Sequence, residues 1–203
     1  MTEAILPKVT LDTNCIIDLE MKTLEAHHIE KIVQAHQKKK IRLRVVAMGA
    51  SESKPDGTCA TNYREFQKKI NAIGLSDVEA LRPIAYLGMA FLDYCVFGGG
   101  EATQLERGIH DVLFPEIQFD YREYCGKHGI SDATKLDRVW RNAKCDVLGL
   151  WSHRWNGGGV FATRDKNFLR KVSDLKRIVP SNVSEAQELK VLTPETACQE
   201  PRL

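Results

Sequence analysis

The first fifty residues alternate short apolar runs with stretches in which apolar residues recur at helical spacing. "KVTL" at Lys8–Leu11 predicts a short buried strand, and a helix is expected to begin near Ile16. A second helix is predicted over Glu25–Lys39, and "IRLRVVAM" at Ile41–Met48 predicts a second strand. This strand–helix–strand order implies parallel pairing through a right-handed crossover.

The last third of the chain has the same character. The most regular helical pattern covers Asp132–Trp155, where Ser131 is a candidate cap and "WNGGG" is a stop signal. Strands are predicted at Gly159–Thr163 and at Leu189–Glu195. The stretch Leu175–Pro180 fits either a strand or an irregular segment.

The middle of the chain is different. "SESKPDG" at Ser51–Gly57 is a break, after which Tyr63–Phe97 has a mainly helical pattern with an interruption at Gly74–Asp77. "GGGEATQLERG" is expected to be a loop. We therefore predict one α/β domain over residues 1–203, with a helical elaboration at about 55–131.

Composition narrows the class of protein. Of 203 residues, 43% are hydrophobic and 28% are charged, as in globular proteins. A net charge of +2 is too small to indicate a nucleic-acid partner by itself. The six cysteines form no CxxC pair, and no signal sequence or membrane span is recognisable, so a reduced, cytoplasmic protein is expected.

Four acidic residues lie where a parallel sheet builds its sites. Asp12 and Asp165 follow predicted strands, Glu52 follows the strand that ends near Met48, and Asp146 lies at the border of the long helix's apolar stripe. Four carboxylates in one place repel one another unless a cation lies between them. Mg²⁺ and Mn²⁺ prefer oxygen ligands and suit such a cluster.

Each acid also has an ordinary structural interpretation. An Asp after a strand is commonly a helix N-cap, which applies to Asp12 and Asp165. Glu52 can be a solvated loop residue, and Asp146 a partner in an i,i+4 pair on a helix surface. Position and spacing alone favour neither the metal site nor these structural roles.

Two segments resemble the ends of a PIN domain, namely "VTLDTNCIIDL" and "DVLGLWSHRWNGGGVFATRDKNF". The first matches a strand that ends in Asp followed by Thr and Asn, and the second matches a helix Asp followed by a Thr-x-Asp-x-x-Phe turn. "MGASES" supplies the acid expected after the second strand. The resemblance covers about the first 52 residues and residues 140–195.

The likeness has two departures. Asn167 stands where many members carry a second acid, which can thin the charge around a second metal ion. The run Gly149–Trp151 interrupts what is usually an alanine-rich stretch, which can alter helix packing beside the site.

The resemblance implies a three-layer α/β/α sandwich with a mostly parallel central sheet and a divalent-metal-dependent ribonuclease. Mg²⁺ or Mn²⁺ would activate water for in-line attack on phosphorus, leaving a 5′-phosphate and a 3′-hydroxyl. The implied ligands, which are also the catalytic residues, are Asp12, Glu52, Asp146 and Asp165. Asn14 and Thr163 would orient these carboxylates, with Asp18 in a supporting role. Small members are often toxins with an inhibitory protein partner, and often form homodimers.

Basic and aromatic residues near these acids suggest how an RNA substrate, single-stranded or structured, would be held. Arg164 and Lys166 flank Asp165, and with Arg170 they are the predicted phosphate contacts. The tryptophans at 140, 151 and 155 have helical spacing, so we expect core packing before base stacking.

Two other functions stay open. A PIN-like fold without activity would be an RNA-binding or scaffolding module, and a flap-type relative would be a structure-specific DNA nuclease. The presence of all four acids favours an enzyme, and the sequence has no recognisable helix-hairpin-helix motif for gripping DNA.

Overall fold

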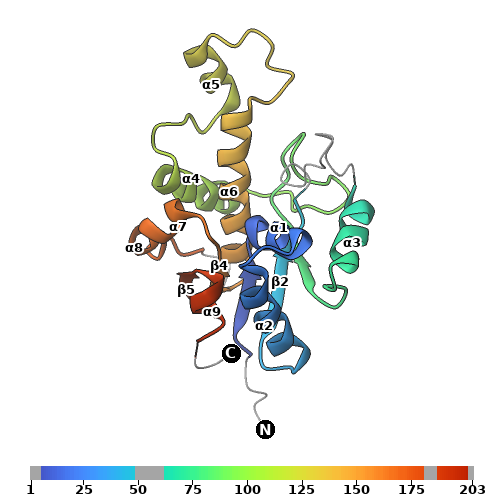
Figure 1. Ribbon diagram of the computed structural model, residues 1–203. Coiled ribbons are helices and arrows are strands. Elements are labelled where there is room, and N and C mark those ends of the chain that lie inside the picture. The colour runs from blue at the N-terminus through green and yellow to red at the C-terminus, as the bar shows by residue number, and fades with distance from the viewer. Residues whose placement is uncertain (1–5, 49–61, 181–186, 201–203) are drawn as a thin grey trace.

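A parallel sheet forms the centre of the protein (Figure 1). The structure, a computed structural model, describes residues 6–48, 62–180 and 187–200. Within these ranges five strands pair in the order β3-β2-β1-β4-β5, and every neighbouring pair is parallel. They are β1 (Lys8–Leu11), β2 (Arg42–Val46), β3 (Glu79–Leu81), β4 (Gly158–Ala162) and β5 (Gln187–Leu192). The expected α/β/α sandwich with a parallel sheet is confirmed.

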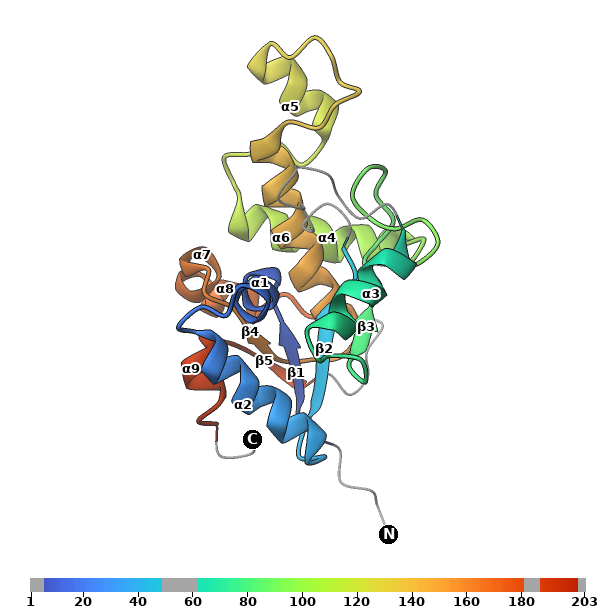
Figure 2. The same cartoon turned by 45° about the vertical axis from the view of Figure 1, so that its right-hand side comes forward.

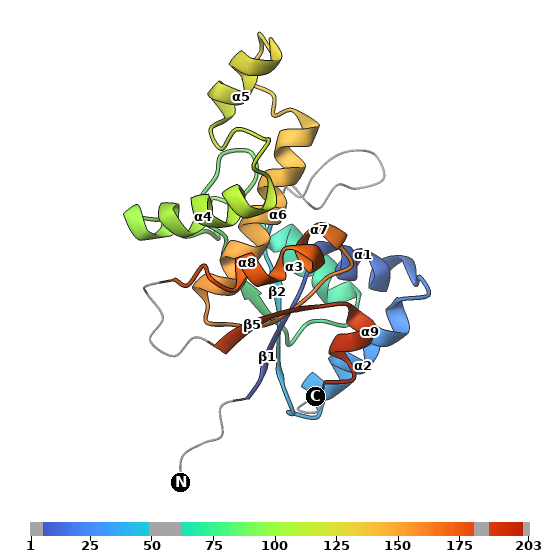
Figure 3. The same cartoon turned by 90° about the vertical axis from the view of Figure 1, so that its left-hand side faces the viewer.

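Helices cover both faces of the sheet (Figure 2). One face packs against α1 (Thr13–Met21), α2 (Ala26–Gln37), α3 (Tyr63–Ala72) and α9 (Pro194–Ala197). The other packs against α4 (Gly100–Leu113), α6 (Arg138–Trp155), α7 (Lys166–Arg170) and α8 (Val172–Leu175). One further helix of the described chain, α5 (Tyr121–His128), projects away from the sheet (Figures 1 and 3). None of the described helices combines the length and apolar character needed to cross a bilayer.

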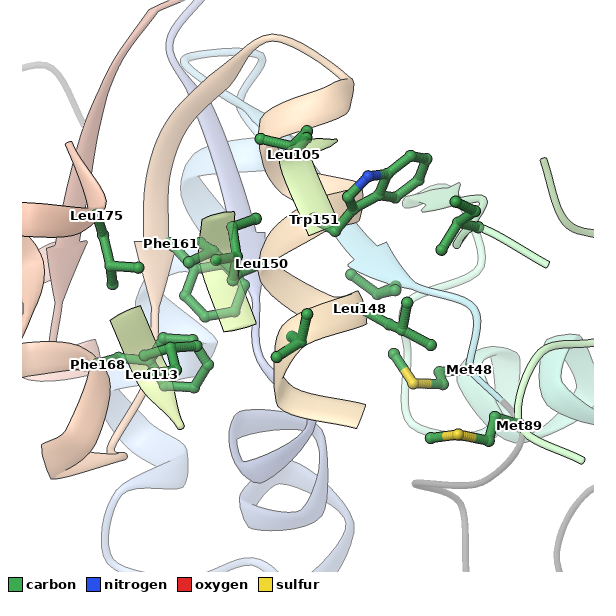
Figure 4. Close-up of a cluster of buried hydrophobic side chains, with 14 of the residues drawn as sticks. Met48, Met89, Leu105, Leu113, Leu148, Leu150, Trp151, Phe161, Phe168 and Leu175 are labelled. Carbon is green, nitrogen blue, oxygen red and sulfur yellow. The ribbon is translucent and has the colours of Figure 1, made fainter. Parts of the chain in front are cut away.

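Alternation along β4 shows how the strands divide the core. Val160 and Ala162 belong to the cluster under α1 and α2, whereas Phe161 points to the opposite face. There Phe161 and Leu150 lie together with Leu113 and Phe168 (Figure 4). This cluster holds α4, α6 and α7 against the sheet, and it also contains the predicted core residues Trp140 and Trp151.

The helical prediction for Tyr63–Phe97 is largely wrong. Helix α3 ends at Ala72, β3 follows at the edge of the sheet, and the chain then runs without a helix to Gly99. The strand has only three residues, of which Leu81 alone is buried, so it has no apolar alternation to reveal it.

The loop prediction for "GGGEATQLERG" is also wrong, because α4 begins at Gly100. The glycines provide only the approach to the helix. Beyond them, buried apolar residues recur at helical spacing: Ala102, Leu105, Ile109 and Leu113.

Three boundaries differ from the prediction. Helix α6 begins at Arg138, not Asp132, because the carboxylate of Asp137 accepts bonds from the next backbone amides and replaces Ser131 as the cap. Strand β5 starts at Gln187, and Pro194 opens α9 where the prediction closed the strand with it. Residues 175–180, where the sequence fits either a strand or an irregular segment, contain the end of α8 and a turn.

A buried ion pair fixes the helical elaboration to the core. Lys144 Nζ lies 2.6 Å from Glu106 Oε1, which joins α6 to α4, and both side chains are almost fully buried. The ammonium also lies over the rings of Phe119, Tyr86 and Trp140, at 3.9, 5.0 and 5.3 Å from their centroids. Burial lowers the pKa of Lys144, and Glu106 opposes that shift.

A second buried cation holds the opposite end of α6. Arg44 on β2 is 1% exposed, and its guanidinium donates to the carbonyls of Asn156 (2.8 Å) and Gly158 (2.5 Å). It also lies 3.3 Å from Nδ1 of His153, which is 2.8 Å from the Thr10 hydroxyl. The guanidinium therefore meets the negative end of the α6 dipole, which compensates part of its desolvation.

Replacing Arg44 with Met should destabilise the fold by about 3 kcal/mol, because buried carbonyls at the end of α6 lose their donor. For a chain of this size the Tm should fall by roughly 6–12 °C. The matched variant is Arg42→Met on the same strand, whose half-exposed ion pair with Glu79 should contribute no more than about 1 kcal/mol. Thermal unfolding compares the two, and equal losses would show that Arg44 has no special structural role.

Candidate active site

Helix α6 places Asp146 at the carboxyl edge of the sheet. The helix runs back along the sheet and enters β4 through a two-residue turn, so its C-terminal end lies at the amino end of the strands. Asp146 is nine residues before Trp155, or about 14 Å along a helix, while five-residue β4 is about 16 Å long. Its carboxylate therefore reaches the level where β1 and β4 end.

The turn that fixes this placement depends on glycine. Gly159 has a φ of +101°, and a Cβ at this position would lie 2.4 Å from the carbonyl oxygen of Lys8. Only glycine lets the chain approach β1 this closely in that conformation. The "WNGGG" stop signal therefore also sets the register between α6 and the sheet.

Asp12 lies at the end of β1 and is the N-cap of α1. Its Oδ1 accepts a 2.7 Å bond from the Thr13 amide. Its Oδ2 accepts 2.6 Å bonds from the Asn14 side-chain amide and from the Thr163 hydroxyl. The N-cap interpretation of Asp12 is confirmed, and its role as a metal ligand stays a prediction.

The turn after β4 is tied to the same network. Asn14 Nδ2 lies 3.0 Å from the Thr163 hydroxyl oxygen, which also accepts a 3.0 Å bond from the Asp165 amide. Asn14 Oδ1 accepts from the Arg164 amide at 3.2 Å. Asp165 caps α7 by accepting from the Asn167 amide at 2.7 Å. Asn14 and Thr163 thus join Asp12 to the turn that carries Asp165, and their role in orienting metal ligands stays a prediction.

Electrostatics couples the three aspartates. Burial raises the pKa of Asp12 to about 6, and the charge of Asp165 adds to the rise, while bonds from Thr163 and Thr13 oppose it. Burial also raises the pKa of Asp146 well above its usual value, and the charges of Asp12 and Asp165 add to this shift. Asp12, Asp146 and Asp165 therefore form one mutually repelling group, which we call the aspartate triad.

Asp18 and Arg164 form a clamp beside the triad. Asp18 is fully buried on α1, and its two oxygens lie 2.9 and 2.6 Å from Nη2 and Nε of Arg164. Its Oδ1 also accepts a 2.8 Å bond from the Thr23 hydroxyl. Asp18 thus joins α1 to the turn that carries Asp165, and it gives Arg164 a structural partner.

The other predicted phosphate contacts remain on the surface. Lys166 and Arg170, both on α7, are exposed, and no ion pair among the described residues involves either of them. Asn167, at the position where PIN domains often have a second acid, points its amide to the carbonyl of Leu113 at 3.0 Å. The side chain of Asn167 therefore contacts α4 and does not join the triad.

Glu52, the remaining predicted ligand, lies outside the described residues. Within the described ranges, no three carboxylate, imidazole or thiol side chains are grouped closely enough to hold a metal ion. The triad nevertheless offers the oxygen donors that Mg²⁺ and Mn²⁺ prefer, together with a mutual repulsion that a cation would relieve.

Sequence reasoning missed two residues around the site, buried Cys15 and exposed Thr23. Cys15 is fully buried on α1, its thiol donates to the carbonyl of Ala162 at 3.2 Å, and burial and the charge of Asp12 raise its pKa. Thr23 supports Asp18 from beyond the end of α1. Neither residue belongs to a spacing pattern, since both contacts depend on how α1 docks on the sheet.

Comparisons of the chain with protein-family models, with characterised proteins and with solved structures found no significant match.

Asp146→Asn should raise the Tm of the metal-free protein at pH 7.5, and the gain should disappear toward pH 5. The folded state favours protonated Asp146, so its stabilising contribution is present at low pH and is lost as pH rises through the raised pKa. Relief of about 1 kcal/mol corresponds to roughly 2–4 °C. Thermal unfolding in EDTA measures the difference between variant and parent.

Comparing variant with parent at each pH removes the contribution of His110 and His153. Burial lowers the pKa of both, so they destabilise the fold as pH falls. Asp174→Asn, at an exposed aspartate, is the control and should leave the Tm unchanged at every pH. A Tm for Asp146→Asn that stays below the parent at pH 7.5 would contradict the repulsion inferred for the triad.

Arg164→Gln should cost about 3 kcal/mol, because it leaves the Asp18 carboxylate buried without a cation. Combining it with Asp18→Asn should restore most of that loss, since the neutral amide keeps a partner in Thr23. Urea unfolding of both single variants and the double variant gives the coupling energy. Additive losses would mean that the clamp does not act as a unit.

Proposed function

We propose that this protein is a divalent-metal-dependent ribonuclease of the PIN type, acting at the aspartate triad. The observation that carries the proposal is that Thr163 and Asn14 join Asp12 to the turn that carries Asp165, while Asp146 on α6 lies near enough for the charges of both to act on it. Segments far apart in sequence bring three carboxylates to one sheet edge, at the expense of mutual repulsion. A purely structural role for all three would not require that repulsion.

The chemistry of the donor set fits a hard cation, since all three side chains offer carboxylate oxygens, but in this structure they are not grouped closely enough to hold the ion without moving. Asp12, Asp146 and Asp165 would hold Mg²⁺ or Mn²⁺, with Glu52 as a further candidate from the resemblance. When bound, such a cation lowers the pKa of a coordinated water and neutralises charge on a phosphodiester. The resemblance to PIN domains, carried by Asp12 to Asn14 and by Thr163 to Phe168, supports this assignment.

The surrounding residues of the chain orient the carboxylates. The Thr163 hydroxyl and the Asn14 amide bind Oδ2 of Asp12, and these two bonds restrict rotation of the Asp12 carboxylate. Asp18 holds the guanidinium of Arg164 to α1, so the turn that carries Asp165 stays in place. The exposed cation Lys166 follows Asp165 directly, and exposed Arg170 lies one turn further along α7, so both can contact phosphates of the bound strand.

Hydrolysis by this arrangement adds water to phosphorus and breaks the bond to the 3′ oxygen, which leaves with a proton. The products are a 5′-phosphate and a 3′-hydroxyl. An inhibitory protein partner and a homodimer remain expectations from the resemblance, and the proposal does not depend on either.

Purified protein should cut labelled single-stranded RNA with Mn²⁺ or Mg²⁺ and should not cut it in EDTA. Asp146→Asn and Asp165→Asn should lower the cleavage rate at least about 100-fold, the upper end of what loss of an outer-shell partner causes at metal sites. Gel analysis of product length, with a 5′-phosphate-dependent exonuclease to identify the new ends, measures both claims.

Asp174→Asn is the control variant, and it should cut at the parental rate. Cleavage of single-stranded DNA in preference to RNA would favour the DNA-nuclease alternative. Tight RNA binding without cleavage in any metal would favour the inactive binding module. Metal-dependent cleavage that survives Asp146→Asn would overturn the triad as the active site.

A further inference from the structure

Helix α6 extends well past the sheet on the side of the aspartate triad. Its 18 residues span about 27 Å, whereas β4 spans about 16 Å, so about 10 Å of helix overhangs the carboxyl edge. The overhang leads to α5, which projects from the same end of the molecule (Figures 1 and 2). This length exceeds what covering the sheet requires, and one side of it packs against α4 and α5.

The face of the overhang that continues from Asp146 is exposed. Asn142 is one turn before Asp146 and Val139 is two turns before it, so all three share one side of the helix. Asn142 is exposed, and Val139 is 58% exposed. Arg138 is exposed at the border of the same side. The opposite side carries buried Trp140 and Lys144, which hold the helix to the core.

Local hydrogen bonds already use three acids around the overhang. Asp120 and Asp137 cap α5 and α6, and Asp132 binds the Thr134 amide. The hydrogen bond from the Tyr124 hydroxyl is the main cause that lowers the pKa of Asp137, and the hydrogen bond from the Thr134 hydroxyl is the main cause that lowers the pKa of Asp132. Among the ion pairs of the described residues, none involves Arg138. Its charge is therefore available to a ligand.

We propose that the exposed side of the α6 overhang, made of Arg138, Val139 and Asn142, guides a single-stranded RNA into the aspartate triad. The inference rests on the proposed function and adds the path of the substrate. Arg138 would bind a backbone phosphate, Asn142 would donate to a phosphate or a base edge, and Val139 would contact a base.

The charge and polarity of the exposed side of the overhang favour single-stranded RNA as its ligand. A cation beside an exposed apolar residue fits a polymer that presents phosphates and unstacked base faces together, as a single strand does. A duplex buries its base faces and would leave Val139 without a contact. Lys166 and Arg170 are exposed on α7, the helix that Asp165 of the triad caps. A strand bound at the acids would therefore have cations available on both α6 and α7.

Asn142→Lys provides a gain-of-binding test that misfolding cannot mimic. Binding of a fluorescein-labelled single-stranded RNA is measured by anisotropy at several salt concentrations, with the parent protein and variants in EDTA. One added phosphate contact should steepen the slope of log K against log salt by about 0.7, which tightens binding about fivefold at 0.1 M salt. Arg138→Gln should have the opposite effect, of similar size.

Controls match the net charge of each variant. Gln199→Lys adds the same charge beyond α9, and Arg177→Gln removes one from a residue that is 81% exposed on its side chain. Both should bind RNA like the parent. If Asn142→Lys and Arg138→Gln instead match their controls while the parent binds RNA, the path is wrong and the proposed function stands. If the parent shows no RNA binding even at low salt, the proposed function fails as well.

Discussion

The hydrogen bond from the Thr163 hydroxyl to the Asp12 carboxylate is the interaction on which the site depends. It joins residues 151 positions apart across the neighbouring strands β1 and β4. Asn14 bonds both side chains, so one amide sets the distance between the end of β1 and the turn after β4. Without this network, Asp12 would be only a helix cap and Asp165 only the cap of a short helix.

Repulsion among carboxylates destabilises the site, and in the described residues this repulsion is confined to the triad. Asp12, Asp146 and Asp165 repel one another, while the nearest fully buried acid, Asp18, is neutralised by Arg164. The chain thus compensates the acid that supports the backbone, whereas no ion pair of the described residues involves the acids of the triad. That contrast is the reason for proposing that the triad binds a ligand.

Features that depend on local pattern could be predicted from the sequence, and features that depend on docking could not. Apolar runs that end in Asp12 and Asp165 revealed both the strands and the acids, because parallel strands end at one edge. The three-residue β3 and the glycine-led α4 have weak or misleading local signals. The Asp18–Arg164 clamp joins residues 146 positions apart, and no spacing rule connects them. Raised carboxylate pKa values likewise follow from burial, which exists only in the folded chain.

The helical elaboration has a physical reason to be attached where it is. The part of a helix that extends beyond its sheet has no strands to pack against, and helical turns without tertiary packing are only marginally stable. The overhang of α6 therefore needs a second support. The Lys144–Glu106 pair and the rings around it provide that support, with α4 on one side and the segment before α5 on the other. At the far end, Arg44 binds the carbonyls of Asn156, the C-cap of α6, and of Gly158 at the start of β4. Asp146 lies between these two buried cations, on a helix held at both ends, so its carboxylate keeps a fixed position relative to the strands that α6 covers.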